Sequence, residues 1–208
     1  MHTIGIPRLL LMEHAGLAVA RAVRTILPTP TGECLVCCGS GYNGGDGLCA
    51  ATHLVQWGYQ PRVLVAGALP HLNEEPAIYA RILQALHVPV IEVHSQDASP
   101  ILDEAFRRSA LMVDALLGIG LRGPVRPLYA QLIKRMSRAH VPIISVDVPS
   151  GLDADTGLPQ PIAVRATVTV TFGLPKQGFF VGQGPAHVGR LIVDEIGIPR
   201  EVLMKGQG

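Results

Sequence analysis

The sequence predicts an α/β fold, a three-layer αβα sandwich around a Rossmann-like, mostly parallel sheet. Short apolar segments typical of buried strands alternate along the chain with segments whose apolar residues recur at helical spacing. Three of the predicted strands run into glycine-rich loops that carry aspartate. The length of 208 residues, 48% of them hydrophobic, is sufficient for one sizeable core, so we expect a single domain over residues 1–208.

The individual elements follow from the apolar patterns and from the glycines and prolines between them. Strands are predicted at residues 34–37, 62–66, 88–93, 110–117, 142–147, 166–173 and 190–194, and helices at 7–27, 48–57, 74–87, 101–108 and 128–138. Pro7 suits the first turn of the first helix, and Pro28 ends it. Glu13 and His14 within that helix are interpreted as part of a solvated face.

Composition argues against several kinds of partner and site. With a formal charge of +1 and no run of basic residues, the chain lacks the positively charged surface that binding to nucleic acid requires. No apolar stretch reaches the roughly 18 residues of a membrane span, and no signal-peptide pattern opens the chain, so we expect a cytoplasmic protein. The four cysteines are interpreted as small core residues, because the pair Cys34 and Cys37 would face opposite sides of a strand.

The first glycine-rich loop, residues 38–47, joins a predicted strand to a predicted helix and contains five glycines. Glycine lets the backbone approach a ligand closely, and the N–H groups at a helix N-terminus favour an anion such as a pyrophosphate. The alternative is a tight turn with no ligand. An ordinary NAD-dependent dehydrogenase is disfavoured, because no acidic residue ends strand 62–66, where a ribose-binding carboxylate is expected.

Two further predicted strands carry an aspartate. Asp114 lies inside the apolar strand 110–117, where a bare carboxylate would cost several kcal/mol, so it must be paired, hydrogen-bonded or bound to a cation. The turn that follows, residues 118–124, contains Arg122, which suits a phosphate or, alternatively, a surface ion pair. Asp147 ends strand 142–147. In an open parallel sheet these strand ends face one crevice.

Four segments together carry a family resemblance: residues 42–47, 113–123, 146–157 and 171–176. In this order they closely resemble the NAD(P)H-hydrate epimerase family, also called the YjeF N-terminal domain. The resemblance runs from residue 11 to residue 199, so it implies one epimerase domain over residues 1–208. Two positions depart from the family pattern, Tyr42 and His14, each of which is commonly asparagine.

The resemblance implies an isomerase that repairs nicotinamide cofactors. Such enzymes interconvert the R and S forms of NADHX and NADPHX, so that an ADP- or ATP-dependent NAD(P)H-hydrate dehydratase can restore the cofactor. It also implies a homodimer and a bound potassium ion. The rival hypothesis is a non-catalytic ligand-binding or scaffolding module on the same fold, and phosphoryl transfer is disfavoured because no P-loop lysine is present.

The resemblance also assigns residues to the site. Potassium would be held by Asn43, Asp114 and Ser150, an oxygen ligand set that hard cations prefer. Substrate would contact Tyr42, Asn43, Gly44, Gly45, Asp46, Gly118, Ile119, Gly120, Leu121, Arg122, Gly123, Pro124 and Asp147. Epimerisation at C6 of the hydrate needs proton transfer at the hydroxyl oxygen, worth roughly 10²–10⁴ in rate from one positioned group. Asp147 is the first candidate, and Lys176 is the second candidate or a substrate contact.

Overall fold

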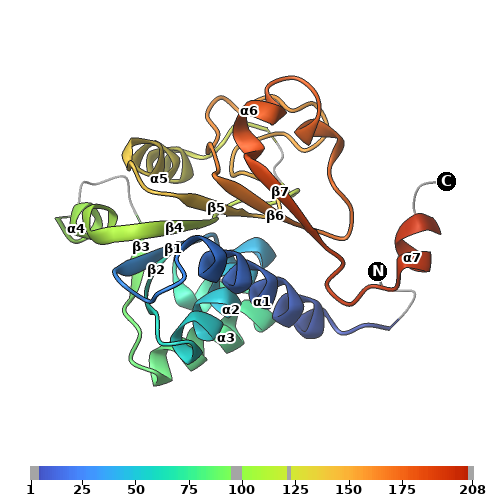
Figure 1. Ribbon diagram of the computed structural model, residues 1–208. Helices are drawn as coiled ribbons and strands as arrows, with labels where there is room; N and C mark the ends of the chain where they lie inside the picture. Colours follow the sequence, from blue (N-terminus) through green and yellow to red (C-terminus); the bar gives the residue numbers. More distant parts are fainter. Residues whose placement is uncertain (1–4, 95–99, 121–122, 206–208) are drawn as a thin grey trace.

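The computed structural model describes residues 5–94, 100–120 and 123–205. Within them one seven-stranded sheet has the order β3-β2-β1-β4-β5-β6-β7 (Figure 1). The strands are β1 (Glu33–Cys38), β2 (Gln60–Ala66), β3 (Val90–Val93), β4 (Ser109–Ala115), β5 (Ile143–Val146), β6 (Val168–Phe172) and β7 (Arg190–Asp194). Every neighbouring pair is parallel, which confirms the predicted α/β class.

Helices cover both faces of this sheet. The helices are α1 (Arg8–Ile26), α2 (Tyr42–Gln56), α3 (Glu74–Ala85), α4 (Pro100–Arg108), α5 (Pro127–Arg138), α6 (Gly184–Val188) and α7 (Arg200–Lys205), with 3-10 turns η2 (Leu69–His71) and η3 (Gln177–Phe179). Helices α1, α2 and α3 lie together on one face, whereas α4 and α5 lie on the other (Figure 1). In the described part of the chain, no helix is both long and apolar enough to cross a membrane.

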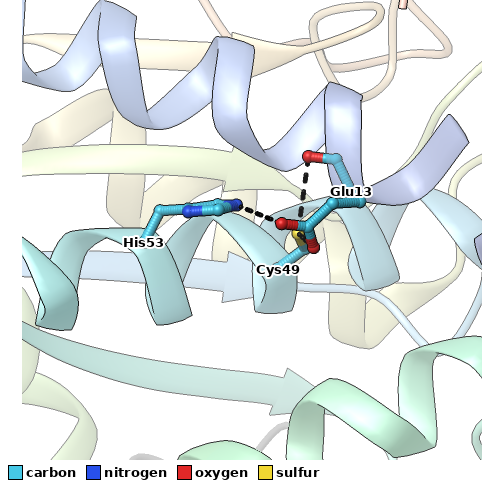
Figure 2. A group of neighbouring side chains, drawn as sticks. All are labelled: Glu13, Cys49 and His53. Atoms are coloured by element: carbon cyan, nitrogen blue, oxygen red, sulfur yellow. Dashed lines mark hydrogen bonds and ion pairs between the residues drawn. The ribbon is translucent and has the colours of Figure 1, made fainter. Parts of the chain in front are cut away.

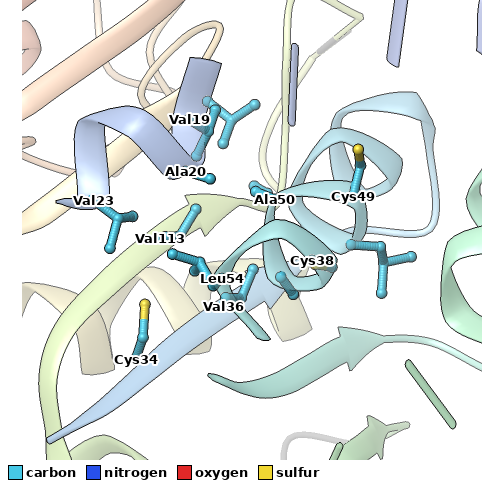
Figure 3. Close-up of a cluster of buried hydrophobic side chains, with 14 of the residues drawn as sticks. Val19, Ala20, Val23, Cys34, Val36, Cys38, Cys49, Ala50, Leu54 and Val113 are labelled. Carbon is cyan, nitrogen blue, oxygen red and sulfur yellow. The ribbon is translucent and has the colours of Figure 1, made fainter. Parts of the chain in front are cut away.

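Two apolar cores result from the alternation of side chains along the strands. Val36 and Val113 point toward α1 and α2, where they meet Val19 and Leu54 (Figure 3). The residues next to them in sequence, such as Leu35, point into the second core under α4 and α5. All four cysteines are buried and free, as predicted, and Cys34 and Cys37 do lie in opposite cores.

The strand order fixes where a ligand can bind. From β1 the chain winds outward through β2 to β3, then crosses back and places β4 on the other side of β1. The register sets Cys37 beside Asp114, so the loops after β1 and β4 leave the sheet side by side. Such a reversal is the usual place for a ligand in a doubly wound sheet.

The structure corrects several predicted boundaries. Helix α2 begins at Tyr42, whereas the sequence predicted a loop as far as Gly47 and a helix from Leu48. Strand β5 stops at Val146 because Asp147 has a left-handed backbone, with φ of 63°. Helix α6 lies between predicted strands 166–173 and 190–194, in residues 174–189, which the sequence assigns to a loop, and α7 was not predicted.

Candidate active site

A cavity of about 790 Å³ opens at the carboxyl ends of the central strands. Its lining comes from α1, from the loop after β1 and the start of α2, from the loops after β4 and β5, from α5, and from the segments that follow β6 and β7. Nine of the residues predicted to contact substrate or perform chemistry line it: Tyr42, Asn43, Asp46, Gly118, Ile119, Gly120, Pro124, Asp147 and Lys176. The topology therefore brings most of the predicted site into one cavity.

The loop after β1 is pressed against the loop after β4. A Cβ atom on Gly39 would lie 2.0 Å from the carbonyl oxygen of Leu116, and one on Gly44 would lie 1.9 Å from the carbonyl oxygen of Gly39. Gly45 packs against the side chains of Met12 and Pro76. Gly44 and Gly45 thus serve close packing and do not line the cavity, while the N-terminus of α2 opens onto it at Gly41 and Tyr42.

Asp114 is fully buried, and its carboxylate accepts hydrogen bonds from neutral groups. Oδ2 accepts from the hydroxyl of Ser145 and from the backbone N–H of Ser150, both at 2.8 Å. Oδ1 has only a long contact of 3.5 Å with the N–H of Leu116. Burial raises the pKa of Asp114, and these hydrogen bonds partly offset the rise. A nearby positive charge would therefore be favourable.

Ser150 and Asn43 both contact the loop after β4, the strand that carries Asp114. The hydroxyl of Ser150 accepts a hydrogen bond from the N–H of Leu117 at 2.9 Å. The amide of Asn43 lies against the next residue, Gly118, and its Nδ2 atom is buried without a hydrogen-bond partner among the described groups.

These three residues fit a monovalent cation. The carboxylate of Asp114 has no ion-pair partner among the described residues, and rotating the amide of Asn43 would exchange its unpaired nitrogen for an oxygen. Hydroxyl, amide and carboxylate oxygens suit hard cations. The chemistry of the three side chains therefore suits the potassium ion that the family resemblance implies, and the ion site itself stays a prediction.

Asp147 lies at the end of β5 and forms an ion pair with Lys176. Lys176 Nζ donates to Asp147 Oδ1 at 2.6 Å, to the hydroxyl of Thr171 at 2.8 Å and to the carbonyl of Phe172 at 3.0 Å. Oδ1 also accepts from Thr171 and from the N–H of Phe172. Because these contacts all converge on Oδ1, they leave Oδ2 for a ligand in the cavity.

Asp46, in the first turns of α2, is a second acid in the cavity. Packing around its carboxyl group raises its pKa well above the ordinary value, and the negative charge of Asp147 raises it further. The cavity thus holds one carboxylate paired with a lysine and one carboxyl group that retains its proton to higher pH.

Five of the predicted residues remain to be placed. Gly123 is exposed outside the lining, and Asp114 and Ser150 lie behind the lining residues Leu116 and Leu117. Leu121 and Arg122 are outside the described residues, so the predicted phosphate contact of Arg122 stays a prediction.

Several contributors were missed. Arg8 and Arg126 line the cavity, and Arg8 donates a hydrogen bond to the hydroxyl of Tyr42 at 2.6 Å. Nothing in the spacing marks Arg8, whereas Arg126 follows the second glycine-rich loop, where a basic residue was a detectable signal. Ser145 donates a hydrogen bond to Asp114, and Thr171 donates one to Asp147. Both could have been detected as polar residues inside apolar strands.

Fold and cavity define the class to which this molecule belongs: doubly wound α/β proteins with a ligand site where the strand order reverses. A family model described as "YjeF-related protein N-terminus" matches residues 8–178. The chain belongs to this family.

Similar proteins agree with this assignment. The chain is 40% identical to an NAD(P)H-hydrate epimerase of Limosilactobacillus fermentum, over 95% of this chain and 90% of that protein. It is 42% identical to the bifunctional NAD(P)H-hydrate repair enzyme Nnr of Pyrobaculum aerophilum, over 99% of this chain and 41% of that protein. The crystal structure of the yeast protein ynu0 superimposes with a TM-score of 0.82 at 29% identity, covering 99% of this chain and 86% of that one.

Proposed function

We propose that this protein is an NAD(P)H-hydrate epimerase that interconverts the R and S forms of NADHX and NADPHX. Relatives that match nearly end to end carry this name. The observation that carries the proposal is the cavity where Asp147, its partner Lys176 and the N-terminus of α2 meet. The cavity therefore combines a group that can transfer a proton, the carboxylate of Asp147, with a site for an anion at the start of α2.

Substrate binding would use the two strand-end loops. The volume of about 790 Å³ lies in the range of small-molecule pockets, roughly 300–1,000 Å³. Backbone N–H groups at the start of the 15-residue helix α2 favour a phosphate, and Arg8 and Arg126 add positive charge to the lining. Gly118, Ile119 and Gly120, from the loop after β4, also line the cavity.

Proton transfer would fall to Asp147. A side chain that exchanges a proton with the C6 hydroxyl must present a free oxygen, which Oδ2 supplies. Lys176 is better suited to a positioning role, because an ammonium has three N–H donors and three acceptors already surround Nζ. Asp46, with its raised pKa, would donate a hydrogen bond to a polar group of the substrate.

A potassium ion would be held by Asn43, Asp114 and Ser150. When bound it would supply the positive charge that the buried carboxylate of Asp114 lacks and would hold the loop after β4 in place. The donor chemistry and the unpaired amide of Asn43 support this assignment.

The proposal extends to partners and location. A dehydratase specific for the S form would consume the product, in keeping with the name of the bifunctional relative. We further propose a homodimer acting in the cytoplasm, where gel filtration with light scattering would test the assembly.

The direct test is to supply purified (R)-NADHX to the protein together with an S-specific dehydratase and to follow the recovery of NADH. We expect recovery far faster than spontaneous epimerisation. Recovery at the spontaneous rate, from a protein that binds the hydrate, would instead support a non-catalytic binding module.

A further inference from the structure

Three potential metal ligands gather away from the cavity lining, where α1 crosses α2. They are Glu13 on α1 and Cys49 and His53 on α2 (Figure 2). Cys49 and His53 are four residues apart, so they lie on one face of α2, and Glu13 points at both. One ligand atom from each of the three lies within 4.8 Å of the other two.

Two of the three distances are close to those between ligands of a small divalent ion. His53 Nε2 lies 3.0 Å from Glu13 Oε1, and Cys49 Sγ lies 3.4 Å from Glu13 Oε2. With metal bonds of about 2.0–2.3 Å at tetrahedral angles, neighbouring ligand atoms stand roughly 3.3–3.6 Å apart. Small side-chain adjustments would therefore place all three atoms on one ion.

Two further observations point to a ligand. His53 Nε2 is buried and, despite its short distance to Glu13, is not aligned for a hydrogen bond with any described group. Tyr79, from α3, donates a hydrogen bond of 2.7 Å to Glu13 Oε2. Carboxylates that bind a metal are commonly oriented by a hydrogen bond of this kind. The side chain of Glu13 is 45% exposed, so an ion can reach it from solvent.

We propose that Glu13, Cys49 and His53 form a zinc site that clips α1 to α2. Sulfur, imidazole nitrogen and carboxylate oxygen together suit Zn²⁺, a borderline-soft ion, and do not suit potassium or magnesium. Three protein ligands leave the fourth position for water. On binding, the thiol of Cys49 loses its proton to solvent and sulfur binds the metal as thiolate, without any redox change.

The competing description is a hydrogen-bonded joint between three helices with no metal. In that case Glu13 accepts from Tyr79 and Cys49, and the cluster only packs α1 against its neighbours. The two descriptions differ in what happens when a transition metal is added, because a hydrogen-bonded joint has no use for one.

The test adds Co²⁺, a spectroscopic substitute for Zn²⁺, to the purified, metal-stripped protein. We expect a thiolate-to-cobalt charge-transfer band in the near ultraviolet that saturates at one ion per chain and disappears when Zn²⁺ is added. Zn²⁺ should also raise Tm. Absence of the thiolate band in the unmodified protein would overturn the proposal, whatever the variants do.

Variants locate the site. Cys49→Ala should lose the thiolate band, and His53→Gln should weaken cobalt binding by at least about 100-fold, since replacing a residue that only hydrogen-bonds to a metal ligand already costs about 10–100-fold. The matched control is Cys34→Ala, a buried thiol in the same core but outside the cluster, which should keep the band. Circular dichroism confirms that each variant is folded, and a band that persists in Cys49→Ala would contradict the assignment.

Discussion

Asp147 is the residue on which the proposed chemistry depends. It has a left-handed backbone, with φ of 63°, and thereby turns the chain out of the sheet at the end of β5. Aspartate and asparagine tolerate this conformation better than most residues. The fold therefore restricts the position to a few residue types, of which aspartate alone combines the backbone preference with a carboxylate.

Replacing Asp147 by Asn should lower the rate of epimerisation of purified (R)-NADHX by a factor of 10² or more. The amide keeps the backbone preference but cannot exchange the proton, a function worth roughly 10²–10⁴ in rate. Folding is checked by circular dichroism and Tm. A variant that turns over at nearly the normal rate would remove Asp147 from this role.

Asp46 gives a prediction about pH. Its pKa in the folded protein is raised above the ordinary value of 3.8, so ionisation is less favourable in the folded state than in the unfolded one. Between the pKa of the unfolded state and that of the folded state, the folded protein binds more protons than the unfolded one. The stability of the fold therefore falls as pH rises from about 3.8 through the raised pKa.

Asp46→Asn removes the free-energy cost of ionising a buried carboxyl group. The variant should therefore be more stable than the unmodified protein at pH 8 and should lose that advantage below pH 4. A gain of a few degrees in Tm is expected at pH 8, since about 1 kcal/mol moves Tm by roughly 2–4 °C at this size. Thermal unfolding across the pH range is the measurement. An equal difference at both pH values would show that the carboxyl group is not perturbed.

At the scale of elements, the start of α2 shows what the sequence could and could not predict. The glycine-rich stretch was assigned to a turn that brings the backbone close to a ligand, and glycine is also a poor helix former, costing about 1 kcal/mol relative to alanine. In the structure Gly44 and Gly47 lie in helical turns, pressed against Gly39 and against Ala115 on β4. Tertiary contact overrides propensity here, and local patterns carry no information about it.

The contact between the loops after β1 and β4 predicts that replacing Gly39 or Gly41 by alanine has different effects on the free energy of unfolding. Gly39→Ala would place Cβ 2.0 Å from the carbonyl oxygen of Leu116, which cannot move without shifting β4. A loss of about 1–3 kcal/mol or more in the free energy of unfolding is expected. The measurement is equilibrium unfolding in urea.

Gly41→Ala is the matched control two residues later. A Cβ there meets nothing within 4 Å, and the backbone is extended, with φ of −93°. The free energy of unfolding should stay within about 0.5 kcal/mol. Equal losses in both variants would mean that the close approach of the two loops is not what requires Gly39.

For the whole molecule, the fold class and the location of the cavity were predictable because strand ends in a parallel sheet converge by topology alone. The contact between Glu13 and Cys49 was not predictable from the sequence. Periodicity identifies which face of a helix is buried, but not which other helix packs against that face. The sequence interpretation placed Glu13 on a solvated face, whereas its carboxylate contacts two other helices. Arg8 at the cavity was missed for the same reason.

Potassium should stabilise the folded molecule. In KCl at constant ionic strength, Tm should exceed that in choline chloride, because an ion bound to the folded state adds roughly 2.7 kcal/mol at one hundred times its dissociation constant. Asp114→Asn should abolish the difference, since it removes the buried negative charge. Identical Tm values in the two salts would contradict a potassium site.

The position of β4 between β1 and β5 also bears on how the chain acquires its structure during synthesis. Strands β1, β2 and β3 follow one another along the chain and pair in that order. The other edge of β1 pairs only with β4, where Glu33 lies opposite Ser109, 76 residues further along the chain. Pairings so distant along the chain form late and slowly. A nascent chain that ends before residue 109 would leave the N–H and C=O groups along this edge of β1 unpaired, so we expect chaperones to act on this intermediate.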